Sequence, residues 1–138
     1  MTLETTQMTS NERAQAMEKR LIKFGVDIIK LCREMPNDIV GRHLAKQILR
    51  SGTAPALLYA EARGAESDKD FRHKCSLVLK ESRETHVNLQ LIHGAEVLPQ
   101  PRIDPIEDEA NQLVSIYVRT VQKMDERIRA EEAKKKKK

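Results

Sequence analysis

Residues 44–92 decide the fold, and they read LAKQILRSGTAPALLYAEARGAESDKDFRHKCSLVLKESRETHVNLQLI. Apolar side chains recur there at alternating spacings of four and three residues, the period of an amphipathic helix. The turn residues around Gly64 interrupt this period once, so the segment predicts two long helices that meet at a short hinge. Arg and Glu also fall on the apolar stripes, where a charge is costly unless it is paired. We therefore expect these charged side chains to have specific partners.

The same spacing continues on both sides of this segment and predicts two further helices. The four expected helices cover about 11–35, 38–63, 68–93 and 104–130. Thr9 to Glu12 has the form of a capping box, and Ser67 is a favourable N-cap for the third helix. The strongest start signal is Asp104-Pro105-Ile106-Glu107, because an Asp cap precedes a proline at the first helical position.

Short connections between long helices make sequence neighbours antiparallel. We therefore expect an all-α protein: an antiparallel up-down-up-down four-helix bundle over residues 11–130, a flexible N-terminus over 1–10 and a disordered lysine tail over 131–138. Pro55 cannot donate a hydrogen bond to the carbonyl of Ser51, so it predicts a kink or a short break between these residues. The hydroxyls of Ser51 and Thr53 are expected to satisfy the backbone groups that Pro55 frees.

The formal net charge of +4 is concentrated at the C-terminus, where residues 134–138 are all lysine. Without them, 20 basic side chains face 21 acidic ones, so the rest of the chain is close to neutral. A run of like charges repels itself and stays solvated, which predicts a disordered tail. Such a tail is expected either to bind a polyanion such as RNA by counterion release or only to aid solubility.

Several classes of protein lack support in the sequence. No apolar run approaches 18 residues, and the polar N-terminus has no apolar core like that of a signal peptide. Cys32 and Cys75 lie in apolar helical patterns and are expected to be buried, reduced thiols, which predicts a cytoplasmic protein. Neither the cysteines nor the histidines have metal-site spacing, and no glycine-rich phosphate loop occurs. We expect no cofactor and no metal.

Four short motifs carry a resemblance to a known family. They read RSGT at 50–53, AEARGAES at 60–67, DF at 70–71 and LKESRET at 79–85. In this order they resemble the four-helix-bundle proteins encoded in intervening sequences of bacterial 23S ribosomal RNA genes, also called S23 ribosomal proteins. The resemblance covers about residues 20–128. Arg50, Glu61, Glu81 and Glu84 match the family pattern, whereas Pro55, and Leu58 in place of the usual Asn, depart from it.

The resemblance also implies properties that spacing and composition do not. It implies a homopentameric ring of up-down bundles, and no enzymatic activity is established for the family. It further implies a distant relation to the accessory variability determinant of diversity-generating retroelements, which is taken to engage nucleic acid and a reverse transcriptase.

Charged residues on the apolar stripes have two interpretations. Glu61, Glu81 and Glu84 would pair with Arg50, Arg63 or Arg83 inside the bundle or across a subunit interface, or they would form a carboxylate site for a metal or acid–base chemistry. A di-iron bundle needs Glu-x-x-His motifs, and no histidine follows a glutamate at that spacing. We therefore expect a structural buried-charge network and no catalytic residues. Its expected members are Arg50, Glu61, Glu81, Arg83 and Glu84.

Basic residues mark the expected nucleic-acid contacts. They are Arg42, Lys46 and Arg50 on the second helix, with Lys134, Lys135, Lys136, Lys137 and Lys138 in the tail. Aromatic residues make up only 3% of the chain, so readout of bases by stacking is not expected and binding would be to the phosphate backbone. Leu49, Leu57, Leu79 and Ile116 exceed the needs of one bundle interior, which predicts a homo-oligomer.

These observations together predict a non-enzymatic, oligomeric binding or scaffold protein that engages RNA or a nucleic-acid-bound protein through charge. The alternative is a purely structural protein-interaction module. A carboxylate-based enzyme is the least supported class.

Overall fold

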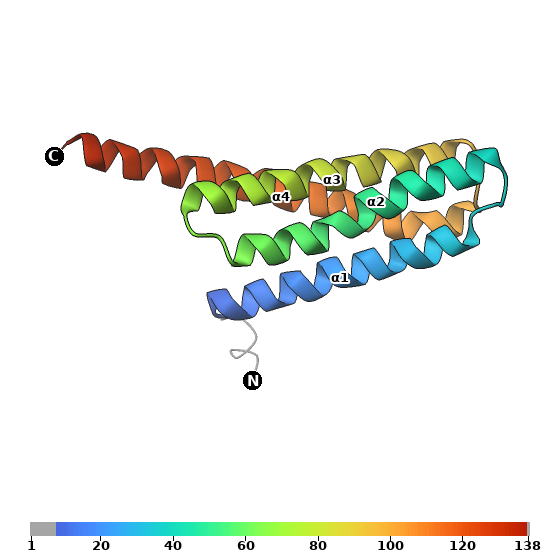
Figure 1. The fold of residues 1–138 in the computed structure, drawn as a ribbon, viewed down its shortest axis with the longest axis horizontal. Helices are drawn as coiled ribbons and strands as arrows, with labels where there is room; N and C mark the ends of the chain where they lie inside the picture. Colours follow the sequence, from blue (N-terminus) through green and yellow to red (C-terminus); the bar gives the residue numbers. More distant parts are fainter. Residues whose placement is uncertain (1–7, 138) are drawn as a thin grey trace.

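The computed structural model describes residues 8–137, which form four helices. The helices are α1 (Ser10–Glu34), α2 (Ile39–Arg63), α3 (Asp68–Gly94) and α4 (Gln100–Lys136). Each helix runs antiparallel to the one before it, and helices that are adjacent in sequence pack side by side (Figure 1). The predicted all-α, up-down-up-down four-helix bundle is confirmed. Most of the predicted flexible N-terminus, residues 1–7, lies outside the described residues.

Side-chain caps fix the starts of the first three helices close to where the sequence predicts them. The Thr9 hydroxyl accepts a hydrogen bond from the Glu12 amide at 3.0 Å, and the Glu12 carboxylate accepts one from the Thr9 amide at 2.9 Å. These bonds complete a capping box and lower the pKa of Glu12. Asp38 and Ser67 cap α2 and α3 in the same way, each accepting from the amide three residues on.

Helix α4 begins at Gln100, four residues before the predicted start at Asp104, so that prediction is wrong. Pro101 lies in the first turn, where a missing amide hydrogen costs no intrahelical bond, and only Pro105 removes one. Tertiary contacts stabilise the extra turn. Ile103 is fully buried, and the Arg102 guanidinium donates to both carboxylate oxygens of Glu34 on α1. This bond also lowers the pKa of Glu34.

Helix α2 continues through Pro55 without a break, and its ribbon bends near the middle (Figure 1). A missing hydrogen bond at proline is a known cause of such bends. The expected role of the nearby hydroxyls is not found, because neither of them bonds the Ser51 carbonyl oxygen, the group that Pro55 leaves without its helical donor. Thr53 Oγ1 donates to the carbonyl oxygen of Leu49 at 2.7 Å, whereas the Ser51 hydroxyl bonds side chains of α3 and no backbone group.

The prediction of a disordered tail from residue 131 is also wrong, because α4 remains helical to Lys136. The sequence leading into the lysines, Ala130-Glu131-Glu132-Ala133, consists of strong helix formers. Lysine itself favours a helix, and its charge is favourable at the negative end of the helix dipole. Two ion pairs also tie the end of α4 to the start of α3: Arg127 to Asp68 at 3.1 Å and Lys69 to Glu132 at 3.7 Å.

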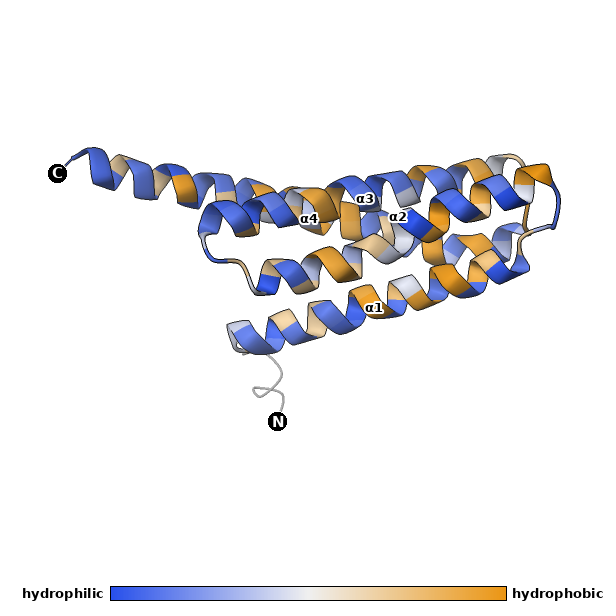
Figure 2. Ribbon diagram, in the orientation of Figure 1, coloured by the Kyte–Doolittle hydropathy of each residue, from blue (hydrophilic) through white to orange (hydrophobic). Residues whose placement is uncertain are grey.

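The core consists of buried apolar side chains from all four helices, and apolar residues alternate with polar ones along each helix (Figure 2). Leu21, Ile28, Ile48, Leu89 and Leu113 are among its fully buried side chains. Helices α1 and α2 approach closely where Gly25 faces Gly52. A Cβ atom built on Gly25 would lie 3.7 Å from the Gly52 carbonyl oxygen, an ordinary contact. One built on Gly52 would lie 2.7 Å from Cγ1 and 2.8 Å from Cγ2 of Ile28, which is too close.

This difference predicts opposite effects for two alanine substitutions in the same contact. Gly52→Ala should destabilise the protein by about 1–3 kcal/mol, because Ile28 is fully buried and has no free space to move into. Gly25→Ala should be neutral or stabilising by up to about 1 kcal/mol, because alanine favours the helix and fits. Urea unfolding followed by circular dichroism measures both. Equal effects of the two substitutions would contradict the close contact at Gly52.

Candidate interaction surface

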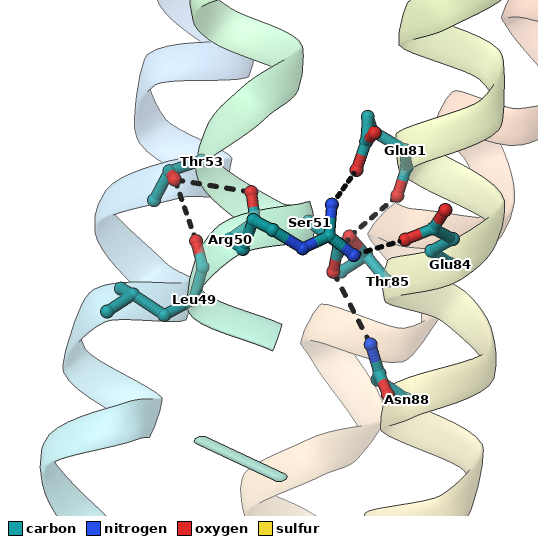
Figure 3. A network of polar contacts seen from close by, with 8 residues as sticks. All are labelled: Leu49, Arg50, Ser51, Thr53, Glu81, Glu84, Thr85 and Asn88. Carbon is teal, nitrogen blue, oxygen red and sulfur yellow. Dashed lines mark hydrogen bonds and ion pairs between the residues drawn. The ribbon is translucent and has the colours of Figure 1, made fainter. Parts of the chain in front are cut away.

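The centre of the candidate surface is Arg50, which reaches from α2 to two glutamates on α3 (Figure 3). Its guanidinium donates to Glu81 at 3.0 Å and to Glu84 at 2.6 Å. The predicted pairing of both carboxylates with Arg50 is therefore correct. The side chain of Arg50 is 61% exposed, so the expected burial of this network is not found within one chain. Ion pairs as exposed as this one contribute below about 1 kcal/mol.

A second polar group lies beneath this ion pair and is buried. Thr85 Oγ1 lies 3.0 Å from Ser51 Oγ and 2.8 Å from the Glu81 carbonyl oxygen, and Asn88 Nδ2 donates to Ser51 Oγ at 3.4 Å. We call these three side chains the Ser51 cluster. Residue spacing alone did not predict the cluster, although polar residues on the apolar stripes were a signal for it. Because an unsatisfied buried hydroxyl is costly, the cluster sets how α2 and α3 align.

The other predicted members of the charge network lie elsewhere. Glu61 pairs with Lys74 at 2.8 Å and not with an arginine, so its predicted partner is wrong. Arg63 instead pairs with Glu18 of α1 at 2.9 Å. Arg83 has no ion pair or hydrogen bond among residues 8–137, and it lines a hollow of about 370 Å³ with Arg50, Glu84 and Val87. Arg50, Glu81 and Glu84 therefore form one ion-pair cluster with Arg83 beside it, whereas Glu61 belongs to a separate ion pair.

The predicted basic face of α2 is weaker than the sequence suggests. Arg42 and Lys46 are exposed, and the Arg42 guanidinium donates only to the neutral amide oxygen of Asn37, at 3.2 Å. The charge of Arg50, by contrast, is offset by Glu81 and Glu84. Two of the three basic residues thus remain available to an anion.

The end of α4 carries the densest positive charge on the described chain. Lys134, Lys135, Lys136 and Lys137 are exposed, while Lys138 lies outside the described residues. The last contacts of α4 with the bundle involve Arg127 and Glu132, and the helix then projects past the start of α3 (Figure 1). At 1.5 Å per residue, the whole of α4 is roughly 55 Å long. We call residues 133–137 the α4 overhang.

Two apolar patches lie on different sides of α2. The α1–α2 patch consists of Ile22, Val26, Leu49 and Leu57, and the α2–α3 patch consists of Val40, Val87 and Leu91. Ile22 and Val26 follow Glu18, the partner of Arg63, at four-residue steps and therefore lie toward α2. Val87 and Leu91 follow Glu84 on the side of α3 toward Arg50. Figure 3 accordingly draws Leu49 on the α1 side of α2 and Arg50 on the α3 side.

Leu49 and Leu57, which are 42% and 67% exposed, are among the four apolar residues predicted to exceed the needs of one bundle. The other two, Leu79 and Ile116, pack against the core, so they are not left over.

A cleft of about 770 Å³ opens between the start of α1, the α2–α3 turn and α4. Met17, Tyr59, Phe71, Ile116 and Met124 are among the side chains that line it. Sequence spacing did not indicate a cleft. Burial raises the pKa of Tyr117 at its wall far above the usual range, so this phenol stays protonated.

The two cysteines are free thiols. Burial raises the pKa of both, that of Cys75 to about 11, which disfavours the reactive thiolate at neutral pH. Across residues 8–137, none of the helices combines the length and apolar character needed to cross a membrane.

Comparison with known families agrees with this architecture. A family model described as 23S rRNA-intervening sequence protein matches residues 13–119. The chain belongs to this family. The matched range includes Arg50, Glu81 and Glu84 but ends before the α4 overhang. The family resemblance predicted from the four sequence motifs is therefore confirmed.

Among solved structures, the chain is similar to a protein of unknown function from the S23 ribosomal protein family of Bacteroides thetaiotaomicron VPI-5482. The two are 27% identical with a TM-score of 0.72, and the match covers 79% of this chain and 97% of the other. No curated protein matches the chain.

The Ser51 cluster leads to a test that separates it from ordinary helix contacts. Thr85→Val removes the buried hydroxyl with little change in shape and should destabilise the protein by about 1–2 kcal/mol. Thr120→Val is the matched control, because Thr120 Oγ1 donates only to the carbonyl four residues before it, at 2.9 Å. The control should cost less than about 0.5 kcal/mol. Chemical denaturation measures both values, and a Thr85→Val variant as stable as the control would contradict the role of the cluster.

Proposed function

We propose that this member of the 23S rRNA-intervening sequence protein family is a non-enzymatic, homo-oligomeric scaffold of the cytoplasm that holds RNA by its phosphate backbone. The observation that carries the proposal is the α4 overhang, which presents exposed lysines beyond a bundle that is otherwise close to neutral. A nucleic-acid-bound protein with an acidic surface would be held by the same charge.

The distribution of the remaining basic residues supports the overhang as the main contact. Six of the twelve arginines already bind carboxylates. Among them, Arg20 binds Glu109, Arg72 binds Asp125 and Arg102 binds Glu34. Among the lysines of the overhang, Lys134 has a long ion pair with Glu131, at 3.9 Å. Lys135, Lys136 and Lys137 are exposed. The four aromatic residues lie in the core or against it, so the described chain offers no stacking surface for bases. Binding would therefore depend on charge and show little sequence preference.

The two apolar patches support self-association. They differ in composition and lie on opposite sides of α2. Contacts between two different surfaces of identical subunits generate a ring when the rotation between subunits closes, and an open filament when it does not. The family resemblance implies five subunits. A ring would bring several overhangs near one polyanion, and multivalent attachment would strengthen weak individual contacts.

A second candidate function rests on the same patches. Patches that remain apolar and exposed would also accept a different protein, which would make the chain a protein-interaction module whose lysines serve only solubility. An enzyme that uses Glu81 and Glu84 has less support, because Arg50 binds both carboxylates.

The RNA proposal predicts a defined dependence on the overhang and on salt. Replacing residues 134–138 by glutamine keeps good helix formers but removes the charge, and it should weaken binding to a single-stranded RNA many-fold at low salt. The slope of log affinity against log salt should fall by about 0.7 for each phosphate that is no longer neutralised. Fluorescence anisotropy at two salt concentrations measures both effects.

The matched control replaces Lys19 and Lys30, two exposed lysines of α1, by glutamine and should leave binding nearly unchanged. If affinity survives replacement of the five lysines but falls in an Arg42→Gln, Lys46→Gln variant, the contact lies on α2. If the unmodified protein does not bind RNA at low salt, the RNA proposal is wrong.

The oligomer proposal predicts that both patches are needed for assembly. Val26→Glu in the α1–α2 patch and Val87→Glu in the α2–α3 patch should each lower the molar mass measured by light scattering, while helical content is kept. Met8→Glu is the control, since Met8 is 44% exposed and lies outside both patches. A monomeric unmodified protein at micromolar concentration would rule out the assembly.

A further inference from the structure

Three potential metal ligands meet at the end of the bundle where α3 passes into α4. One nitrogen of His93 and one carboxylate oxygen each of Asp104 and Glu107 lie within 4.8 Å of one another. Asp104 and Glu107 are three residues apart on α4 and therefore share a face of that helix. His93 comes from the last turn of α3. Metal-site spacing is absent from the sequence because the histidine and the two carboxylates belong to different helices.

The connection between the helices holds this arrangement. The Ala95 and Val97 amides donate to the carbonyl oxygens of Leu91 and Ile92, at 3.0 Å each, and so fold the chain back at the end of α3. His93 also lines a hollow of about 550 Å³ formed with the following loop, which gives water access to the site. Glu107 and His93 are half-buried, whereas Asp104 is exposed and its side chain can rotate toward the other two.

The two carboxylates at this site have no arginine or lysine partner among residues 8–137. Glu107 has one polar partner among residues 8–137, the His93 Nδ1 atom at 3.1 Å, and Asp104 has no hydrogen bond or ion pair there. The nearest arginine in sequence, Arg102, is bound to Glu34 of α1. Two carboxylates without a cationic partner next to an imidazole form an environment that a divalent cation would stabilise.

We propose that His93, Asp104 and Glu107 bind a divalent transition-metal ion of the Zn²⁺ type. An imidazole nitrogen with two carboxylate oxygens suits such ions, whereas Mg²⁺ and Ca²⁺ prefer ligand sets made of oxygen alone. Zn²⁺ requires ligands at about 2.0–2.2 Å, so the three atoms must draw together by side-chain rotation. The metal replaces the hydrogen bond between His93 and Glu107, and water occupies its remaining positions.

Such an ion would link the last turn of α3 to the second turn of α4. Glu107 is about 45 Å along α4 from Lys136, so the metal site is separate from the lysines of the α4 overhang. Its presence therefore neither requires nor excludes RNA binding.

The test is calorimetric titration of the full chain with ZnCl₂ and, separately, with MgCl₂. The expected result is one Zn²⁺ per chain, no comparable binding of Mg²⁺, and a rise in Tm with Zn²⁺. His93→Gln and Asp104→Asn should each lower the Zn²⁺ affinity at least about tenfold. Asp104 is exposed, so its substitution leaves the fold intact, and circular dichroism checks both variants.

His73→Gln is the matched control, because His73 is an exposed histidine of the same helix and should keep the full affinity. The proposal is overturned if the unmodified protein shows no saturable Zn²⁺ binding, or if neither His93→Gln nor Asp104→Asn reduces it. An equal drop in affinity in the His73→Gln variant would also overturn it, by placing the ion elsewhere on α3.

Discussion

Close contact between α1 and α2 at Gly52 is the constraint on which the rest of the bundle depends. Ile28 occupies the space that any side chain at position 52 would need, and Ile28 is itself fully buried. The residue just before, Ser51, bonds α3 through Thr85 and Asn88. Two consecutive residues of α2 thus fix its position against both neighbours, one by the absence of a side chain and the other by a hydroxyl group. The bend at Pro55 follows one turn later and leaves both contacts intact.

The parts of the fold that depend on local chemistry could be predicted from the sequence. The four apolar stripes, the caps at Thr9 and Ser67 and the expected start at residue 38 indicated the architecture and three helix starts to within a residue or two. The start of α4 was missed because the deciding contacts, burial of Ile103 and the pairing of Arg102 with Glu34, come from elsewhere in the fold. The helical lysines were missed for a different reason. Charge repulsion within the run is a local signal, and it is outweighed by helix propensity and by ion pairs to α3.

The candidate site shows the same division. Pairing of Arg50 with Glu81 and Glu84 followed from charges on facing stripes. The exposure of Arg50 depends on how α2 and α3 pack against each other, which the stripes do not specify. Glu61 pairs with Lys74 because the start of α3 passes the end of α2, a neighbourhood that the residue spacing within either helix does not contain. The ligand group at His93, Asp104 and Glu107 is likewise created by the α3–α4 connection. Stripes predict which residues face a neighbour, whereas only the assembled helices determine which pairs meet.

The helical form of the lysine run has a consequence for how a partner can approach. Successive residues of an α-helix are turned by about 100° around the axis, so three consecutive lysines already point in three directions that together encircle it. Positive charge therefore surrounds the tip of α4 on all sides. A rotation of this helix, or a residue inserted between Glu132 and Lys134, would change which lysine faces a given direction but not the charge met there. The charge of the tip therefore does not depend on the direction of approach, and a flexible strand can cross it at any angle and still meet positive charge.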